Sequence, residues 1–205
     1  GAEKVLIVGR TRMGKDYVCV GASSASGEHL RLMNQNCWAD HDGKCPSRIG
    51  DWWSVQGHPC GEQKPPHVED FAVAARSKLG VQNDLDNYLR STVNAWNGPI
   101  DALFDGKIRF TSSGGGYISP DDVPGEATGF WMPATKLTLN TDARGRLGYY
   151  TDDGYRHLNY VGTDTAIPEI SAGQLVRVSL ARWWKPNNAE ESFELRCYGQ
   201  LSGWY

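Results

Sequence analysis

Short segments rich in β-branched, aromatic and alternating apolar residues dominate the pattern along the chain. In the first half they cover residues 5–12, 17–21, 29–33, 52–55 and 68–74. In the second half they cover residues 107–111, 135–139, 148–151, 156–161, 175–184 and 193–201. Such segments, bounded by glycine-containing turns, are typical of β-strands. The pattern therefore predicts an all-β fold class.

One segment instead follows a helical period. Its apolar residues recur at positions that share one helical face: Leu85, Tyr88, Leu89, Val93 and Trp96. Asn83 or Asp84 is suited to the N-cap, and Gly98-Pro99 is a helix stop. We therefore expect an N-terminal unit over residues 1–80, a connecting helix over 81–98 and a C-terminal unit over 99–205.

A short internal similarity relates the two units. Residues 49–55 and 172–178 each contain a glycine and a polar residue, followed by an alternating strand-like segment. Repetition of one supersecondary pattern favours repeated units. We expect two small β-barrels packed side by side, joined by the principal helix.

Composition narrows the possible functions. The chain has 205 residues, a net charge of −3 and 24 glycines. A nucleic-acid-binding protein that relies on bulk charge is usually basic, so such binding would need a local patch here. No apolar run reaches the length of a membrane-spanning helix. The apolar segment at residues 5–8 is too short for the core of a signal peptide. We expect a cytoplasmic protein with no membrane partner.

The five cysteines, an odd number, favour free thiols or a metal site over a disulfide framework. Cysteine and histidine follow the spacing C-x3-H-x3-C and then H-x-C in a polar stretch. Zinc prefers four nitrogen or sulfur ligands. The candidate ligands of a structural zinc ion are Cys37, His41, Cys45, His58 and Cys60. The alternative is free thiols and surface histidines, because the spacing matches no common double C-x2-C motif.

The C-terminal segments predict a hairpin with two distinct faces. If Lys185 pairs with Ser192, the apolar faces of the two strands coincide. The opposite face then combines two arginines, a tryptophan and a tyrosine: Arg177, Trp183, Arg196 and Tyr198. Aromatic rings can stack on bases while guanidinium groups hold phosphate or a base edge. The alternative is that this face packs against the other half of the chain.

Three hypotheses of function follow. The first is a non-enzymatic module for single-stranded nucleic acid or a nucleotide, with Arg10 and Arg12 extending the basic track. The second is a protein–protein adaptor, because arginine and aromatic anchors serve protein partners equally well. The third is a metal-dependent hydrolase around His67 and Glu69. Strand geometry weakens the third hypothesis, because Asp70 would point away from His67 and Glu69 and another group, such as Asp51, would have to complete the site.

The triglycine loop at residues 112–117 is a further candidate. Its backbone N–H groups have little steric cover, so they are suited to an anion. No Gly-Lys-Ser/Thr follows, so it is not a P-loop. A flexible hairpin connection is the favoured interpretation of this loop.

Several motifs resemble a known family. They are V-G-R-T-R-M-G-K at 8–15, I-G-D-W at 49–52, P-H-V-E-D at 66–70, R-V-S-L-A-R-W-W at 177–184 and Q-L-S-G-W-Y at 200–205. Together they resemble the bacterial dual OB domain-containing proteins. The resemblance implies two OB-type barrels, a ligand-binding sheet face and an association with phage defence or mobile elements. It carries no catalytic residues, and residues 37–60 are more cysteine-rich than the family pattern.

Overall fold

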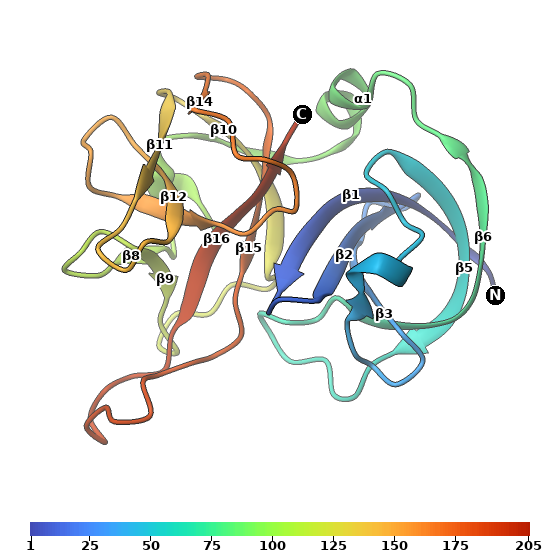
Figure 1. The fold of residues 1–205 in the computed structure, drawn as a ribbon, viewed down its shortest axis with the longest axis horizontal. Helices are drawn as coiled ribbons and strands as arrows, with labels where there is room; N and C mark the ends of the chain where they lie inside the picture. Colours follow the sequence, from blue (N-terminus) through green and yellow to red (C-terminus); the bar gives the residue numbers. More distant parts are fainter.

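The first barrel is built from strands of the N-terminal third. The computed structural model describes residues 1–205 and shows two β-barrels side by side (Figure 1). The elements of the first barrel are β1 (Glu3–Met13), β2 (Tyr17–Ser24), β3 (His29–Met33), β4 (Asp40–His41), a 3-10 turn (Asp42–Lys44), β5 (Asp51–Pro59) and β6 (Asp70–Val81). β1 pairs with both β2 and β5, and β3 runs parallel to β6, so β1-β2-β3-β6-β5 closes on itself.

The second barrel and its connection follow in the chain. The elements are α1 (Leu85–Thr92), β7 (Ala95–Gly98), a 3-10 turn (Ile100–Ala102), β8 (Arg109–Phe110), β9 (Gly116–Ile118), β10 (Thr128–Pro133), β11 (Leu137–Thr141), β12 (Leu147–Tyr150), β13 (His157–Tyr160), β14 (Glu169–Ile170), β15 (Val176–Leu180) and β16 (Cys197–Trp204). Its sheet runs β11-β12-β13-β16-β15-β10. With β10 and β11 taken as two halves of one strand, this order repeats that of the first barrel, including a parallel pair, β13 and β16.

Each barrel has its own apolar core. The first core contains ten buried residues, among them Val5, Ile7 and Val20, and the second contains seventeen, among them Tyr149 and Leu201. Residues with a period of two point into each barrel, as the strand pattern requires. The predicted all-β class with two barrels side by side is therefore confirmed.

The connecting helix is shorter than its sequence pattern predicted. α1 ends at Thr92, and Ala95–Gly98 forms β7, which runs parallel to β10 with Trp96 beside Trp131. The expectation that Trp96 lies on the helix is wrong. Packing of Trp96 against the core of the second barrel overrides the helical period.

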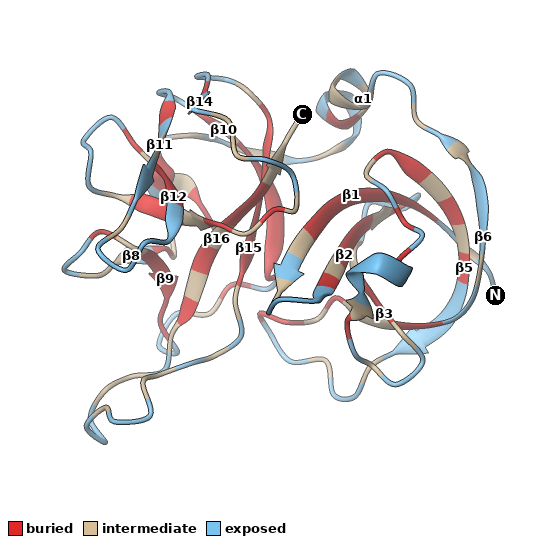
Figure 2. Cartoon of the chain, in the orientation of Figure 1, coloured by how far each residue is buried: buried red, intermediate tan, exposed pale blue.

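The two barrels meet over a third apolar cluster. Its buried members come from β1, α1, β10 and the start of β15: Leu6, Val8, Leu89, Phe130 and Leu175. β1 is thus buried on both faces, which explains its uninterrupted apolar run (Figure 2). Backbone bonds also cross the junction, including Arg12 N–H to the Val161 carbonyl at 2.8 Å. The barrels form one packed unit through this junction.

Candidate functional site

The C-terminal hairpin has a different register from the predicted one. Ser179 lies opposite Gln200, and Arg177 lies opposite Gly203 after a bulge, whereas the prediction placed Tyr198 and Gln200 there. The connection explains the difference, because residues 181–196 form a long loop that projects from the second barrel (Figure 1). Only one isolated bridge, Trp184 to Arg196, lies within that loop. The prediction therefore continued the two strands of the hairpin into residues that form a loop.

Arg177 does not face solvent. All five residues of β15 are buried, and Arg177 is 4% exposed between the barrels. Its guanidinium lies against Gly9 and Gly21 of the first barrel, and its Nη1 donates to Ser202 Oγ at 3.1 Å. The expectation of an open face at this residue is wrong, because the first barrel covers it. The alternative, packing against the other half, is confirmed for Arg177.

The two N-terminal arginines, Arg10 and Arg12, differ in their exposure to solvent. Arg10 is 8% exposed and forms an ion pair with Asp42 at 2.6 Å, so it adds nothing to a surface track. Arg12 is exposed, and its guanidinium carbon lies 5.7 Å from the ring centroid of Tyr160 in the second barrel. Of this pair, only Arg12 is available to a ligand.

An outer face of the second barrel collects polar side chains around Arg12. On β16, Cys197 and Leu201 point into the core, so Tyr198 and Gln200 point outward. Asn159 of β13 lies beside Gln200 in the parallel register. A groove of about 440 Å³ runs along this face, lined among others by Arg12, Arg146, Asn159 and Gln200. We call this surface, with Tyr198, the β13–β16 face.

Aromatic rings and a guanidinium continue the β13–β16 face toward the long loop. The ring of Tyr198 lies 6.3 Å from that of Tyr117 and 6.2 Å from that of Trp184. Arg196 lies over Tyr117 at 4.4 Å and over Phe193 at 4.7 Å. Two of the predicted contact residues, Arg196 and Tyr198, therefore lie on one surface.

The tryptophan on that surface is not the predicted one. Trp183 packs against the core of the second barrel, whereas Trp184 is 48% exposed. Sequence reasoning placed Trp183 on the face opposite the apolar one because it extended regular strand alternation through residues that form a loop. Nothing else in the sequence shows which of the two neighbouring tryptophans, Trp183 or Trp184, is exposed.

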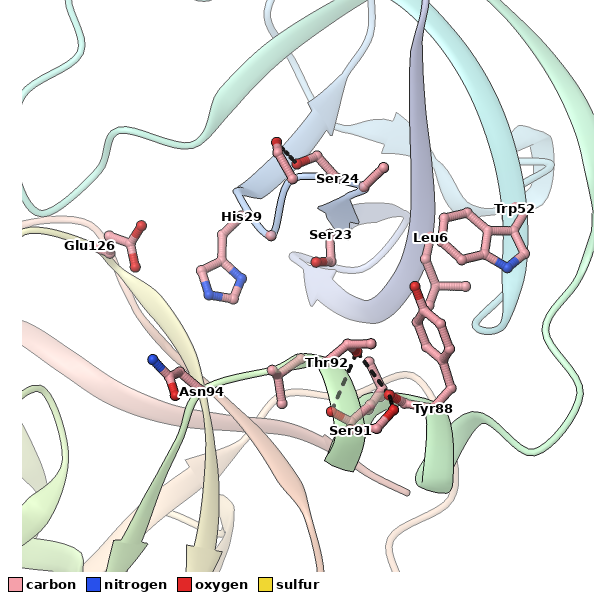
Figure 3. Close-up of a pocket in the computed structure, with 15 residues that line it drawn as sticks. Leu6, Ser23, Ser24, His29, Trp52, Tyr88, Ser91, Thr92, Asn94 and Glu126 are labelled. Atoms are coloured by element: carbon pink, nitrogen blue, oxygen red, sulfur yellow. Dashed lines mark hydrogen bonds between the residues drawn. The ribbon is translucent and has the colours of Figure 1, made fainter.

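A second cavity, of about 680 Å³, lies between the first barrel and α1 (Figure 3). Hydroxyl groups line it from both sides, including Ser23 and Ser24 from β2 and Ser91 and Thr92 from α1. His29 projects into it from the first barrel. No sequence pattern predicted this cavity, because its walls come from segments that are far apart along the chain.

The predicted zinc ligands do not converge. Cys37 and Cys60 form a disulfide, and Cys45 is buried in the first core. His41 packs edge-on against Tyr17, and His58 hydrogen-bonds the carbonyl oxygen of Pro59. No group of three histidine, cysteine, aspartate or glutamate side chains is placed to hold a metal. The residues present do not fit the expected zinc ion, and the preference for thiols over a disulfide is wrong for this pair.

The disulfide gives a testable expectation. It closes a loop with a sequence separation of 23, so the chain-entropy model assigns it about 3 kcal/mol. We expect a reductant to lower the free energy of unfolding in urea by about this amount. The double variant Cys37→Ala/Cys60→Ala should be destabilised similarly and should not respond to the reductant. Five alkylated cysteines in the unreduced, denatured protein would contradict the bond.

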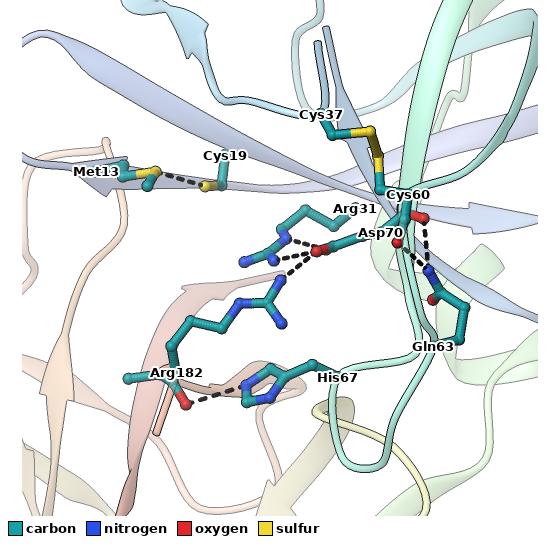
Figure 4. Close-up of polar contacts among 10 residues, drawn as sticks. Met13, Cys19, Arg31, Cys37, Cys60, Gln63, His67, Asp70 and Arg182 are labelled. Atoms are coloured by element: carbon teal, nitrogen blue, oxygen red, sulfur yellow. Dashed lines mark hydrogen bonds and ion pairs between the residues drawn. A yellow bond between two sulfur atoms is a disulfide. The ribbon is translucent and has the colours of Figure 1, made fainter. Parts of the chain in front are cut away.

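Two of the candidate hydrolase residues, His67 and Asp70, form bonds between the first barrel and the segment after β15 (Figure 4). His67 donates from Nε2 to the Ala181 carbonyl at 3.1 Å, and Asp70 accepts from both Arg31 and Arg182. Glu69 is buried, and this burial raises its pKa. Asp51 lies apart from them, paired with Lys78 at 2.7 Å. These side chains form no shared centre, so the hydrolytic hypothesis gains no geometric support.

The triglycine loop is a structural connection. The hydroxyl of Thr111 accepts from the N–H groups of Ser113 and Gly115, and the Thr111 carbonyl accepts from Gly114. Gly114 has φ +88°, and a Cβ there would collide with the Tyr155 carbonyl. The loop needs glycine for its shape, and these N–H groups are already used.

Comparison with models of protein families identifies the family of this chain. A model of the dual OB-containing domain matches residues 3–204. The chain belongs to the dual OB-containing domain family. This agrees with the closed five-stranded barrel and with the second sheet that repeats its strand order, since the OB-fold is a five-stranded Greek-key barrel whose sheet face and loops bind ligands. No curated protein and no solved structure matched. The helices of this dual OB protein are too short or too polar to cross a membrane.

Proposed function

We propose that this dual OB protein is a non-enzymatic binding module that takes a single-stranded nucleic acid or a nucleotide on the β13–β16 face. Family membership supports the general role, because OB-folds commonly bind oligonucleotides on a sheet face. The observation that carries the proposal is the position of Tyr198, which lies next to the exposed ring of Trp184 and the buried ring of Tyr117 and points outward like Gln200. Aromatic platforms bind successive bases, and nearby amide groups supply base-edge hydrogen bonds.

Charge on this face favours stacking over phosphate contacts. Arg146 is paired with Asp142 at 2.8 Å, and Arg196 lies 3.6 Å from Glu194. Arg12 is exposed and has no carboxylate partner. If Arg12 and Arg196 each neutralise one phosphate, the slope of log K against log salt is about −1.4 for a single strand. We expect a weaker salt dependence than for a basic single-strand-binding protein.

Tyr198→Ala is the direct test. Stacking on an aromatic ring contributes about 1–3 kcal/mol per base, so we expect at least about fivefold weaker binding of a labelled 20-nucleotide strand. Fluorescence anisotropy over a salt series measures the affinity. Tyr198→Phe should keep most of the affinity, and Tyr17→Ala, an exposed tyrosine on the first barrel, should keep all of it. Undetectable binding of the unmodified protein at low salt would remove the nucleic-acid proposal.

The adaptor alternative depends on the loop at residues 181–196. Trp184 and Leu195 of this loop are 48% and 43% exposed, which suits a protein partner. Co-purification with a partner that is lost in Trp184→Ser, without oligonucleotide binding, would favour the adaptor. A role in phage defence or mobile elements and a cytoplasmic location stay predictions.

A further inference from the structure

We infer that the cleft between the first barrel and α1 binds an uncharged nucleoside. This site lies outside the β13–β16 face and does not depend on the function proposed there. Its volume of about 680 Å³ is within the range of small-molecule pockets. Figure 3 shows His29 projecting into the cleft, with Asn94 and Glu126 to one side and Trp52 and Tyr88 to the other.

Unsatisfied polar groups point to a polar ligand. His29 Nδ1 is buried and has no hydrogen-bond partner, and a buried group of this kind costs free energy unless something bonds to it. Ser23, Asn94 and Glu126 also line the cleft, and because they are half-buried or exposed their polar atoms are open to a ligand. These groups can both donate to and accept from a ligand. The edge of a nucleobase and the hydroxyls of ribose likewise carry both hydrogen-bond donors and hydrogen-bond acceptors.

The aromatic wall points to a ring. Trp52 and Tyr88 form an edge-to-face pair with centroids 5.7 Å apart, and both line the cleft. Lys4 lies over the ring of Trp52, with its Nζ 4.5 Å from the centroid. An aromatic base can pack against this pair while the hydroxyl-rich side faces its sugar.

The charges of the lining disfavour a phosphate. Glu126 adds a carboxylate, and no lysine or arginine lines the cleft. Burial, together with the positive charge of Arg177, lowers the pKa of His29 to about 4, so the imidazole is neutral at pH 7. Lys4 lies over Trp52, on the side of the cleft opposite Glu126, so a phosphate group placed beside Glu126 would meet a carboxylate with no cation from the lining next to it. The exocyclic amino group of adenosine or cytidine, by contrast, can donate to Glu126.

The experiment measures binding of adenosine, cytidine, uridine, AMP and ribose to the full chain by isothermal titration calorimetry and saturation-transfer NMR. We expect adenosine or cytidine to bind at least tenfold more tightly than AMP or ribose. Glu126→Gln should reduce the preference over uridine, and His29→Gln should weaken adenosine binding at least fivefold. Ser91→Trp fills the cleft from an exposed position and should abolish binding, whereas Ser77→Trp, on an exposed part of β6, should not.

Several outcomes would overturn the inference. They are no adenosine or cytidine binding at millimolar concentration, AMP or ribose binding as tightly as adenosine, and adenosine binding that survives Ser91→Trp. The two proposals fail separately. Tyr198→Ala should leave adenosine binding unchanged, and Ser91→Trp should leave oligonucleotide binding unchanged.

Discussion

Gly21→Ala is expected to lower the free energy of unfolding by about 2 kcal/mol, although alanine normally stabilises a strand relative to glycine. A Cβ at Gly21 would collide with the guanidinium of Arg177. That side chain cannot move aside, because it is enclosed between the barrels and its terminal atoms also lie against Gly9. Urea unfolding followed by tryptophan fluorescence measures the loss.

Gly80→Ala is the matched control for Gly21→Ala. Gly80 also lies in a strand, β6, and a Cβ there would meet no atom within 4 Å. We expect Gly80→Ala to leave stability unchanged or to raise it by about 0.5 kcal/mol. Equal stability of the two variants would show that the Arg177 contact is looser than described.

Arg177→Ala is the second change with a large expected effect, a loss of about 3 kcal/mol. It empties the space between Gly9 and Gly21 and removes the bond to Ser202. Arg177→Met separates volume from charge. Its side chain refills most of the space, and the guanidinium it removes has a hydroxyl rather than a carboxylate as its side-chain partner. We expect Arg177→Met to be at least as stable as the parent protein.

A double-mutant cycle links these two predictions. In the Arg177→Ala background the obstacle to a Cβ at Gly21 is gone, so Gly21→Ala should cost nothing. Additive losses in the double variant would show that the two sites do not touch. Equal losses for Arg177→Ala and Arg177→Met would assign the role of Arg177 to its charge instead of its volume.

Most of the fold could be predicted from the sequence, because strand residues that fill a barrel repeat with a period of two. The pattern fails where a strand has neighbours on both faces. The middle of β1, residues 5–10, and all of β15 are buried, so alternation there says nothing about which side chains meet solvent. Arg177 was therefore assigned to a surface that the first barrel covers.

Less of the candidate site could be predicted, because it depends on contacts between distant segments. Arg12 and Tyr198 are visible as suitable residue types, but the groove near Arg12 is completed by Arg146 from the turn between β11 and β12 and by Asn159 from β13. The pairing of Cys37 with Cys60 likewise depends on how the loops after β3 and β5 approach each other. The cleft at His29 lies between the first barrel and α1, which the sequence pattern predicts as two separate parts of the chain.

The shared junction has a consequence for how this architecture can be divided. A fragment ending near residue 80 would expose Leu6 and Val8 to water and leave the surface around Gly9 and Gly21 without its cover. An exposed apolar patch of this kind favours self-association. We expect gene fission between the halves to be disfavoured in evolution, so the two barrels should be inherited as a single polypeptide.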